Sequence, residues 1–350
     1  MDFIKKIREN PHPFVIAEIG QNHQGDLHIA KQLIKVAKEC GADCAKFQKT
    51  CPKEKFTSSA LNRPYPGANS WGRTYGEHKE FLEFSEKEFE ELQAYAGSIG
   101  ILFTASAMDE ESLRFLQSIQ VPFIKIGSGD SNNPFLIEKA AQTGIPLIIS
   151  TVPGMIDLKT VQKIHGLVSK HHKNFALLQC VSSYPTPCED INLQVISLLQ
   201  KSFPDTLIGY SGHELGIHLS VAAVALGAKI IERHITLDKT LKGSDHKCSL
   251  EPLELKAMIE QMRTLQLALG KPIKKMEPSE EPCFEKLGKS LVYARKLSCG
   301  HPVSLEDLQI KVSSPKGLDG WKYLDVLERR LNCDVDEEDP VLWRHFLPNL

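Results

Sequence analysis

Two histidines, His213 and His234, are the side chains best suited to chemistry in this 350-residue chain. Each follows a short apolar run, in LIGYSGHELGI (207–217) and in KIIERHITLDKT (229–240). The segment between them, 214–227, is rich in Ala, Val and Leu and has the length of a helix. The two strands of a strand–helix–strand unit are parallel, so both histidines would lie at the same sheet edge. There they could form part of an open metal site, or each could cap its strand by hydrogen bonding.

Two lysines, Lys46 and Lys125, lie at the ends of other apolar runs. A buried lysine needs an anion beside it or must lose its proton. The two could therefore form a cradle for phosphate and carboxylate oxygens, helped by nearby hydroxyl groups. Alternatively, each pairs with an acid such as Glu18 or Asp130, or one forms a Schiff base. Glu18 is the most obvious candidate base, whereas Asp130 and Asp245 suit the binding of substrate hydroxyl groups. The hydroxyl groups of the cradle would come from Thr104, Ser128, Ser150, Ser182 and Ser211.

The elements that must position these side chains form a regular series. Eight strand-like runs occur, each followed by a segment with helical character. Such alternation predicts a parallel sheet, and eight units over roughly 250 residues match a closed (β/α)₈ TIM barrel. A doubly wound open sheet is the alternative, but no GxGxxG turn follows an early strand. The strands are expected at 14–20, 44–50, 101–106, 123–129 and 146–151, at the start of 175–184, and before the two histidines. The helices are expected at 27–40, 86–99, 109–118, 134–143, 158–168, 192–200, 214–227 and 253–269.

A barrel places catalytic groups at the C-terminal ends of its strands. Polar residues end every predicted strand, which favours a functional mouth over simple solvation. The long stretch 51–84, rich in Pro, Gly, Ser and aromatic residues, is predicted to be an irregular but ordered excursion on the substrate side. The strand-end residues are Glu18, Lys46, Gln48, Thr104, Ser106, Lys125, Ser128, Ser150, Ser182, Tyr184, Ser211, His213, Glu232 and His234.

Composition limits the function classes. A net charge of −2 argues against a nucleic-acid or membrane surface. No apolar run approaches the ~20 residues that span a bilayer. The charged residues 1–13 lack a signal core, and nine cysteines without a CxxC pair indicate reduced thiols, which together predict a cytoplasmic location.

The chain changes character after Gly270. Residues 1–270 hold the predicted barrel, 271–286 read as a charged, Pro-containing linker, and 287–350 form a small, mostly β module. A module of roughly 60 residues is marginal alone, so it is expected to pack on another surface, such as a partner subunit.

Several motifs together resemble the sialic acid synthase family, most closely its animal type. They are FVIAEIGQNHQGD, CGADCAKFQK, FTAS, FIKIGSGD, IGYSGHE, GAKIIERHITLDKT and GSDHKCSLEP. The resemblance covers nearly the whole chain, and its C-terminal module is similar to an antifreeze-like (SAF) domain. It implies condensation of phosphoenolpyruvate with N-acetylmannosamine 6-phosphate to N-acetylneuraminate 9-phosphate and phosphate. Mannose 6-phosphate, which would give KDN 9-phosphate, stays open as an acceptor.

The resemblance also implies residue roles. His213 and His234 would hold a divalent ion, Mn²⁺ or Mg²⁺, that polarises the sugar aldehyde and positions a water. Carbon 3 of phosphoenolpyruvate attacks the aldehyde, water adds at carbon 2, and phosphate leaves by C–O cleavage, with Glu18 handling protons. The family pairs two subunits so that the C-terminal module of one covers the barrel mouth of the other. By family position, phosphoenolpyruvate would contact Lys46, Thr104, Lys125, Ser128, Ser182 and Ser211, and the sugar would contact Gln48, Asp130, Tyr184 and Asp245.

The sequence departs from the family pattern at specific places. The loop STVPGM, which begins at Ser150, is two residues longer than usual and is expected to affect the reach of that serine. It motivates a second hypothesis, a catalytically impaired paralogue that acts as a binding or structural protein. The retained histidines, lysines and Glu18 argue against that hypothesis. Ser182, where bacterial members commonly carry Asn, is typical of the animal type and favours a phosphorylated sugar. The C-terminal module lacks the Arg of bacterial members, for which Lys316 is a weak substitute.

Overall fold

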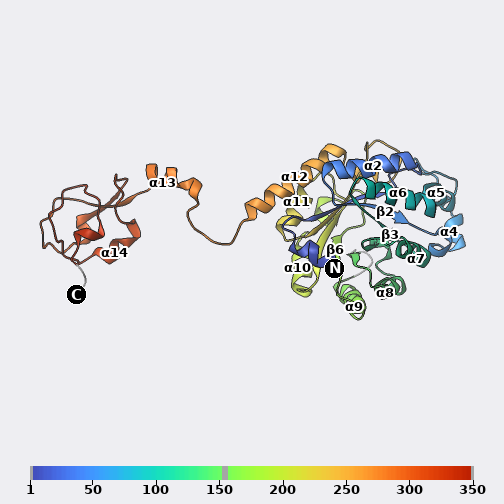
Figure 1. Cartoon of the computed structure of the whole chain (residues 1–350), viewed down its shortest axis with the longest axis horizontal. Coiled ribbons are helices and arrows are strands. Elements are labelled where there is room, and N and C mark those ends of the chain that lie inside the picture. Colours follow the sequence, from blue (N-terminus) through green and yellow to red (C-terminus); the bar gives the residue numbers. More distant parts are fainter. Residues whose placement is uncertain (1–2, 152–156, 348–350) are drawn as a thin grey trace. The chain divides into compact units, whose positions relative to one another are not determined.

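The first compact unit is a closed eight-stranded parallel barrel in strand order β1 to β8 (Figure 1). This computed structural model describes residues 3–151 and 157–347. Strand β1 pairs with β2 on one side and with β8 on the other, which closes the ring and confirms the predicted TIM barrel. The strands are β1 (Phe14–Gly20), β2 (Cys44–Lys49), β3 (Leu102–Ala107), β4 (Ile124–Ile126), β5 (Leu147–Thr151), β6 (Phe175–Cys180), β7 (Leu207–Gly212) and β8 (Ile230–His234).

Eight helices surround the barrel (Figure 1). Their buried faces pack on the strands through a large cluster of Ala, Val, Ile, Leu and Phe side chains. None of the described helices combines the length and apolar character needed to cross a membrane. The helices are α2 (Leu27–Cys40), α6 (Glu86–Ser98), α7 (Glu110–Ser118), α8 (Pro134–Gln142), α9 (Leu158–Ser169), α10 (Gln194–Ser202), α11 (His218–Ala225) and α12 (Pro252–Leu269).

The structure departs from the prediction at 123–129 and at 51–84. The strand expected over 123–129 is regular only at Ile124–Ile126, because the chain turns into a 3₁₀ helix at Ser128–Asp130. The stretch 51–84 was expected to be irregular but contains three short helices, α3 (Pro52–Lys55), α4 (Ser58–Asn62) and α5 (Tyr75–Leu82). Local capping explains α5, since the Thr74 hydroxyl accepts from the Glu77 N–H and the Glu77 carboxylate reaches back to the Thr74 N–H.

Helix α1 (Phe3–Glu9) covers the end of the barrel at which the strands begin, and the sequence analysis did not predict it. Its buried Ile4 and Ile7 join an apolar cluster inside the barrel with residues from the strand starts, such as Ile16 and Ile230. Phe3 stacks on Phe123 with ring centroids 5.2 Å apart. Because apolar side chains fill this end, the cavity that the described residues form lies at the C-terminal ends of the strands.

The second compact unit comprises Lys271–Leu350. The segment predicted as a linker contains a 3₁₀ turn at Pro278–Glu280 and helix α13 (Glu281–Leu287). Beyond it, β9 (Ser290–Tyr293) and β10 (Leu308–Lys311) form an antiparallel pair, followed by helix α14 (Tyr323–Val326). Isolated bridges extend this small sheet, and its core includes Leu291, Tyr293, Val303, Val326, Leu331, Val341 and Phe346.

Candidate active site

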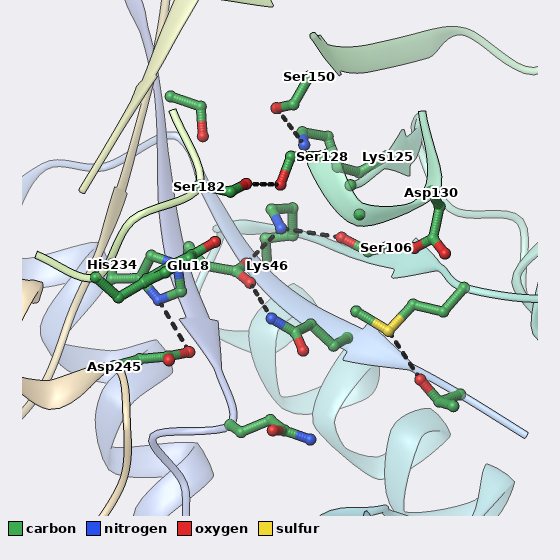
Figure 2. Close-up of a pocket in the computed structure, with 18 of the residues that line it drawn as sticks. Glu18, Lys46, Ser106, Lys125, Ser128, Asp130, Ser150, Ser182, His234 and Asp245 are labelled. Carbon is green, nitrogen blue, oxygen red and sulfur yellow. Dashed lines mark hydrogen bonds and ion pairs between the residues drawn. The ribbon is translucent and has the colours of Figure 1, made fainter. Parts of the chain in front are cut away.

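A cavity of about 430 Å³ opens at the C-terminal ends of the barrel strands. All the predicted site residues except Thr104 line it, although they come from seven of the eight strands or the loops that follow them. Figure 2 shows the two lysines, Glu18 and the serines converging on its floor, with His234 and Asp245 on one wall. The structure therefore brings the side chains selected by the strand-end argument together in one cavity.

Thr104 is the exception, because it lies one layer deeper in the barrel. It is fully buried, and its hydroxyl donates a hydrogen bond to the Phe123 carbonyl oxygen. Residues two apart on a strand point to the same face, so Ser106 occupies the next layer toward the mouth. The Ser106 hydroxyl accepts from Lys46 Nζ at 3.1 Å, and it lines the cavity. Ser106 therefore lines the cavity one layer above Thr104, and the predicted contact of Thr104 with phosphoenolpyruvate stays a prediction.

Four charged side chains form the buried floor of the cavity. Lys46 Nζ lies 2.5 Å from Glu18 Oε2 and 3.7 Å from Glu232 Oε2. Lys125 Nζ lies 3.5 Å from Glu232 Oε1. Each of these side chains is at most 6% exposed, so the two cations and two carboxylates compensate one another in a dry environment. Glu232 was noted at a strand end, but its role as counter-ion to both lysines was not predicted.

The four charges shift one another's protonation. Burial raises the pKa of Glu18 to about 7, because desolvation and the nearby Glu232 charge outweigh the pairing with Lys46. Burial also disfavours the charged form of Glu232, but Lys125 and Lys46 overcome it and lower that pKa to about 2. Burial lowers the pKa of Lys125, whereas the two carboxylates hold the pKa of Lys46 above its usual value. Glu18 is thus the carboxylate that can exchange a proton near neutral pH.

Hydroxyl groups complete the floor. Ser150 Oγ accepts from Lys125 Nζ at 2.8 Å, and Ser211 Oγ donates to Glu232 Oε1 at 2.9 Å. Ser128 Oγ and Ser182 Oγ lie 2.7 Å apart across the cavity. Ser150 therefore keeps its place at the mouth, although most of the longer STVPGM loop, residues 152–156, lies outside the described part of the chain.

The two histidines meet on one wall of the cavity. His213 follows β7 directly and His234 ends β8, and their ring centroids are 5.3 Å apart. Tyr184 packs against His213 at 4.1 Å between ring centroids. Burial lowers the pKa of His213 to about 4, helped by His234, and burial also lowers the pKa of His234. Both rings are therefore neutral at physiological pH, as a metal ligand must be.

The hydrogen bonds of these rings are compatible with metal binding. His213 Nδ1 donates to the Val181 carbonyl oxygen at 2.7 Å, which leaves Nε2 free as a donor to a metal. His234 Nδ1 is buried without a hydrogen-bond partner, and Asp245 Oδ2 lies 3.8 Å away. Within residues 3–151 and 157–347 no three His, Cys, Asp or Glu side chains form a metal cluster. An ion at this pair would therefore take its other ligands from water or substrate.

The insertion between β2 and α6 supplies part of the wall that sequence reasoning did not assign. Lys55, Phe56, Tyr75 and Lys79 from this insertion line the cavity. Lys55 Nζ pairs with Asp130 Oδ1 at 2.9 Å, which ties the insertion to the loop after β4. Only the aromatic content of the stretch signalled its place on the substrate side; nothing in its spacing singled out the two lysines.

The NeuB family model matches residues 33–274. The chain belongs to the NeuB family. It is 53% identical over 332 residues to the N-acetylneuraminate-9-phosphate synthase of Mus musculus, covering 95% of this chain and 92% of the mouse protein. The synthase of the same name from Homo sapiens is 52% identical over the same shares of both chains. A crystal structure of N-acetylneuraminic acid synthetase from Leptospira borgpetersenii in complex with citrate superposes with a TM-score of 0.67 at 34% identity, covering 79% of this chain and 91% of that one.

A second buried ion pair supports the histidine wall of this NeuB-family chain. Arg233, which precedes His234, is fully buried and its Nη1 lies 2.8 Å from Oε1 of Glu214, the residue after His213. Arg233 also donates to the carbonyl oxygens of Gly216 and Glu214. Because this network holds residues 214–216 as a loop, α11 begins at His218 rather than at the predicted residue 214.

Proposed function

We propose that this NeuB-family protein condenses phosphoenolpyruvate with N-acetylmannosamine 6-phosphate. The products are N-acetylneuraminate 9-phosphate and phosphate, a step of sialic acid biosynthesis. The observation that carries the proposal is the convergence of two neutral histidines, two buried lysines and a carboxylate of raised pKa in one cavity. Identity above 50% to synthases of that name supports the same conclusion.

The floor suits phosphoenolpyruvate, which carries a carboxylate and a phosphate. Lys46 and Lys125 provide positive charge, and the hydroxyl groups of Ser106, Ser150 and Ser128 can donate to its oxygens. Both lysines are already held by carboxylates and serines, so they need little reorganisation when the anion enters. Glu232 keeps these cations charged until then.

The histidine wall suits the sugar aldehyde. His213 and His234 would hold Mn²⁺ or Mg²⁺, which when bound supplies Lewis-acid polarisation of a carbonyl oxygen. Gln48, Asp130, Tyr184 and Asp245 lie around the same space and would bind sugar hydroxyl groups. Gln48 Nε2 donates to Glu18 Oε1 at 3.0 Å. Gln48 would therefore contact both the sugar and Glu18, the proposed proton acceptor.

Glu18 is the group that moves a proton. Carbon 3 of phosphoenolpyruvate forms a bond to the aldehyde carbon, and water adds to carbon 2. Glu18, with a pKa of about 7, accepts the proton that this water loses. The proton taken up by Glu18 balances the one that the aldehyde oxygen gains to become a hydroxyl group, and the second proton of the water goes to the departing phosphate. Phosphate leaves with the bridging oxygen, and the oxygen of the added water becomes the keto oxygen.

The second unit is proposed to be an SAF domain that covers the barrel mouth of a partner subunit in a cytoplasmic homodimer. The exposed apolar side chains of Trp321, Leu324 and Ile310 on this unit support a protein-binding role. The nine cysteines, all of them within the described residues, are free thiols, which supports a reducing compartment such as the cytoplasm.

The proposal is tested with metal-stripped protein, phosphoenolpyruvate and N-acetylmannosamine 6-phosphate. Adding Mn²⁺ or Mg²⁺ should release phosphate and form the nine-carbon keto acid in equal amounts, as measured by mass spectrometry. His213→Ala should abolish both, whereas the exposed His218→Ala should not. Ligand binding without product from this acceptor, its unphosphorylated form or mannose 6-phosphate would instead support the paralogue without turnover. That alternative is not favoured, because the chain is more than 50% identical, over 95% of its length, to N-acetylneuraminate-9-phosphate synthases.

A further inference from the structure

Lys79 is a largely buried cation in the outer wall of the cavity that the proposed reaction steps do not use. It lies on α5, and its Nζ donates to Gln21 Oε1 at 3.0 Å. The same ammonium group lies 5.5 Å from the centre of the Tyr75 ring. Lys79, Gln21 and Tyr75 all line the cavity, so this charge faces the space in which a substrate would sit.

Lys79 differs from the other lysines of the cavity in its counter-charge. Lys46 has Glu18 at 2.5 Å, Lys125 has Glu232 at 3.5 Å, and Lys55 has Asp130 at 2.9 Å. No carboxylate of the described residues lies within ion-pair distance of Lys79. Burial lowers its pKa, the Asp245 and Glu83 carboxylates act in the opposite direction, and the Lys55 ammonium adds to the lowering. A largely buried cation without a carboxylate in ion-pair contact is costly, and a bound anion would reduce that cost.

The wall around Lys79 is formed before any ligand binds. A capping box begins α5, and the Tyr75 ring packs edge-on against Phe56 and Tyr65, with centroids 5.4 Å and 5.2 Å away. The Arg63 guanidinium also lies over the Tyr75 ring, 4.2 Å from its centroid. These contacts fix the helix, so Lys79 can bind a ligand without ordering a flexible loop.

Two phosphate-bearing substrates require two anion sites. The floor, with Lys46 and Lys125, serves one of them, and the acceptor aldehyde belongs at the histidine wall. Asp245, which lies 3.8 Å from His234 and also influences the pKa of Lys79, connects that wall with the outer one. We propose that Lys79, assisted by Lys55, binds the terminal phosphate of an aldose phosphate acceptor. This inference rests on the proposed function and names the residues that would select a phosphorylated sugar.

The test measures binding, so it does not depend on turnover. Isothermal titration with Mn²⁺ present compares N-acetylmannosamine 6-phosphate, N-acetylmannosamine and phosphoenolpyruvate on the full chain. Lys79→Met should lower the affinity for the phosphorylated sugar by about ten- to hundredfold, because a charge-assisted hydrogen bond is lost. Affinities for the other two ligands should stay unchanged. Lys79→Arg should retain most of the affinity, and Lys53→Met, an exposed lysine near Lys55, should behave like the wild type.

Two results would overturn the inference. Lys79→Met could lower the affinity for all three ligands alike, which would indicate that Lys79 acts through the fold or through the overall charge of the cavity. The wild type could also bind both sugars equally well. Failure of the proposed function looks different: the wild type would bind the phosphorylated sugar through Lys79 but form no nine-carbon product from any acceptor. A thermal melt of each variant shows whether the fold is retained.

Discussion

Replacing Glu232 by Gln should destabilise the barrel, because it removes the carboxylate that both floor lysines share. A pKa of about 2, against an ordinary value of 4.5, corresponds to about 3 kcal/mol of stabilisation of the ionised form at neutral pH. Loss of one partner from a buried ion pair typically costs a similar amount, about 3–5 kcal/mol. We therefore expect Glu232→Gln to lose about 3 kcal/mol of unfolding free energy at pH 7.

The assay is urea unfolding of the barrel unit of wild type and variant across pH. The folded-state pKa of Glu232 is depressed, so its contribution is complete above 4.5 and is lost as the pH falls toward 2. The difference between the two proteins should shrink over that window. Glu91→Gln is the matched control, since Glu91 forms an exposed ion pair with Lys31 and should cost less than about 1 kcal/mol.

Anion binding separates a charge effect from a packing effect. Inorganic phosphate should stabilise Glu232→Gln more than the wild type, because it replaces the missing negative charge beside Lys46 and Lys125. Equal stability of the two proteins at pH 7 would refute the reasoning. So would a loss that stays constant with pH and does not respond to phosphate.

The remaining predictions concern catalysis. The kcat/KM of the wild type should rise with pH through an apparent pKa near 7, because only ionised Glu18 accepts a proton; Glu18→Gln should lose this limb and fall about 10²–10⁴-fold. A pH–rate profile with the same limb in the variant would assign the pKa elsewhere. Arg233→Lys should keep the buried charge but lose contacts to Gly216 and Glu214, so Mn²⁺ affinity should weaken about tenfold while the KM for phosphoenolpyruvate is unchanged. Unaltered Mn²⁺ affinity would limit Arg233 to a role in folding.

The barrel and most of its site were predictable from sequence, because two simple rules determine them. Parallel strands share an edge, and polar residues end each strand, so Lys46, Lys125 and His213 had to converge. The depth of Thr104 was not predictable, since it depends on how far each strand extends toward the mouth. The shared pairing of Glu232 could not be predicted either, because it depends on how β8 closes on β1. That closure places Glu18 opposite His234, so Glu18 and Glu232 both lie near Lys46.

Other features depend on tertiary contacts that no local pattern encodes. Lys79 lies in a stretch whose short helices are held by aromatic packing around Tyr75 rather than by a long amphipathic repeat. Helix α1 has only seven residues, and its stability comes from burying Ile4 and Ile7 under the barrel. The spacing of these two isoleucines was the one local signal that could have revealed it.

The most direct test of the central claim follows one oxygen atom. Phosphoenolpyruvate labelled with ¹⁸O at the bridging oxygen is converted with N-acetylmannosamine 6-phosphate and Mn²⁺, and both products are analysed by mass spectrometry. If water adds to carbon 2 beside Glu18, the label appears in the released phosphate and the keto oxygen comes from solvent. Label retained in the keto acid would mean cleavage between phosphorus and oxygen, and would contradict the mechanism assigned to this cavity.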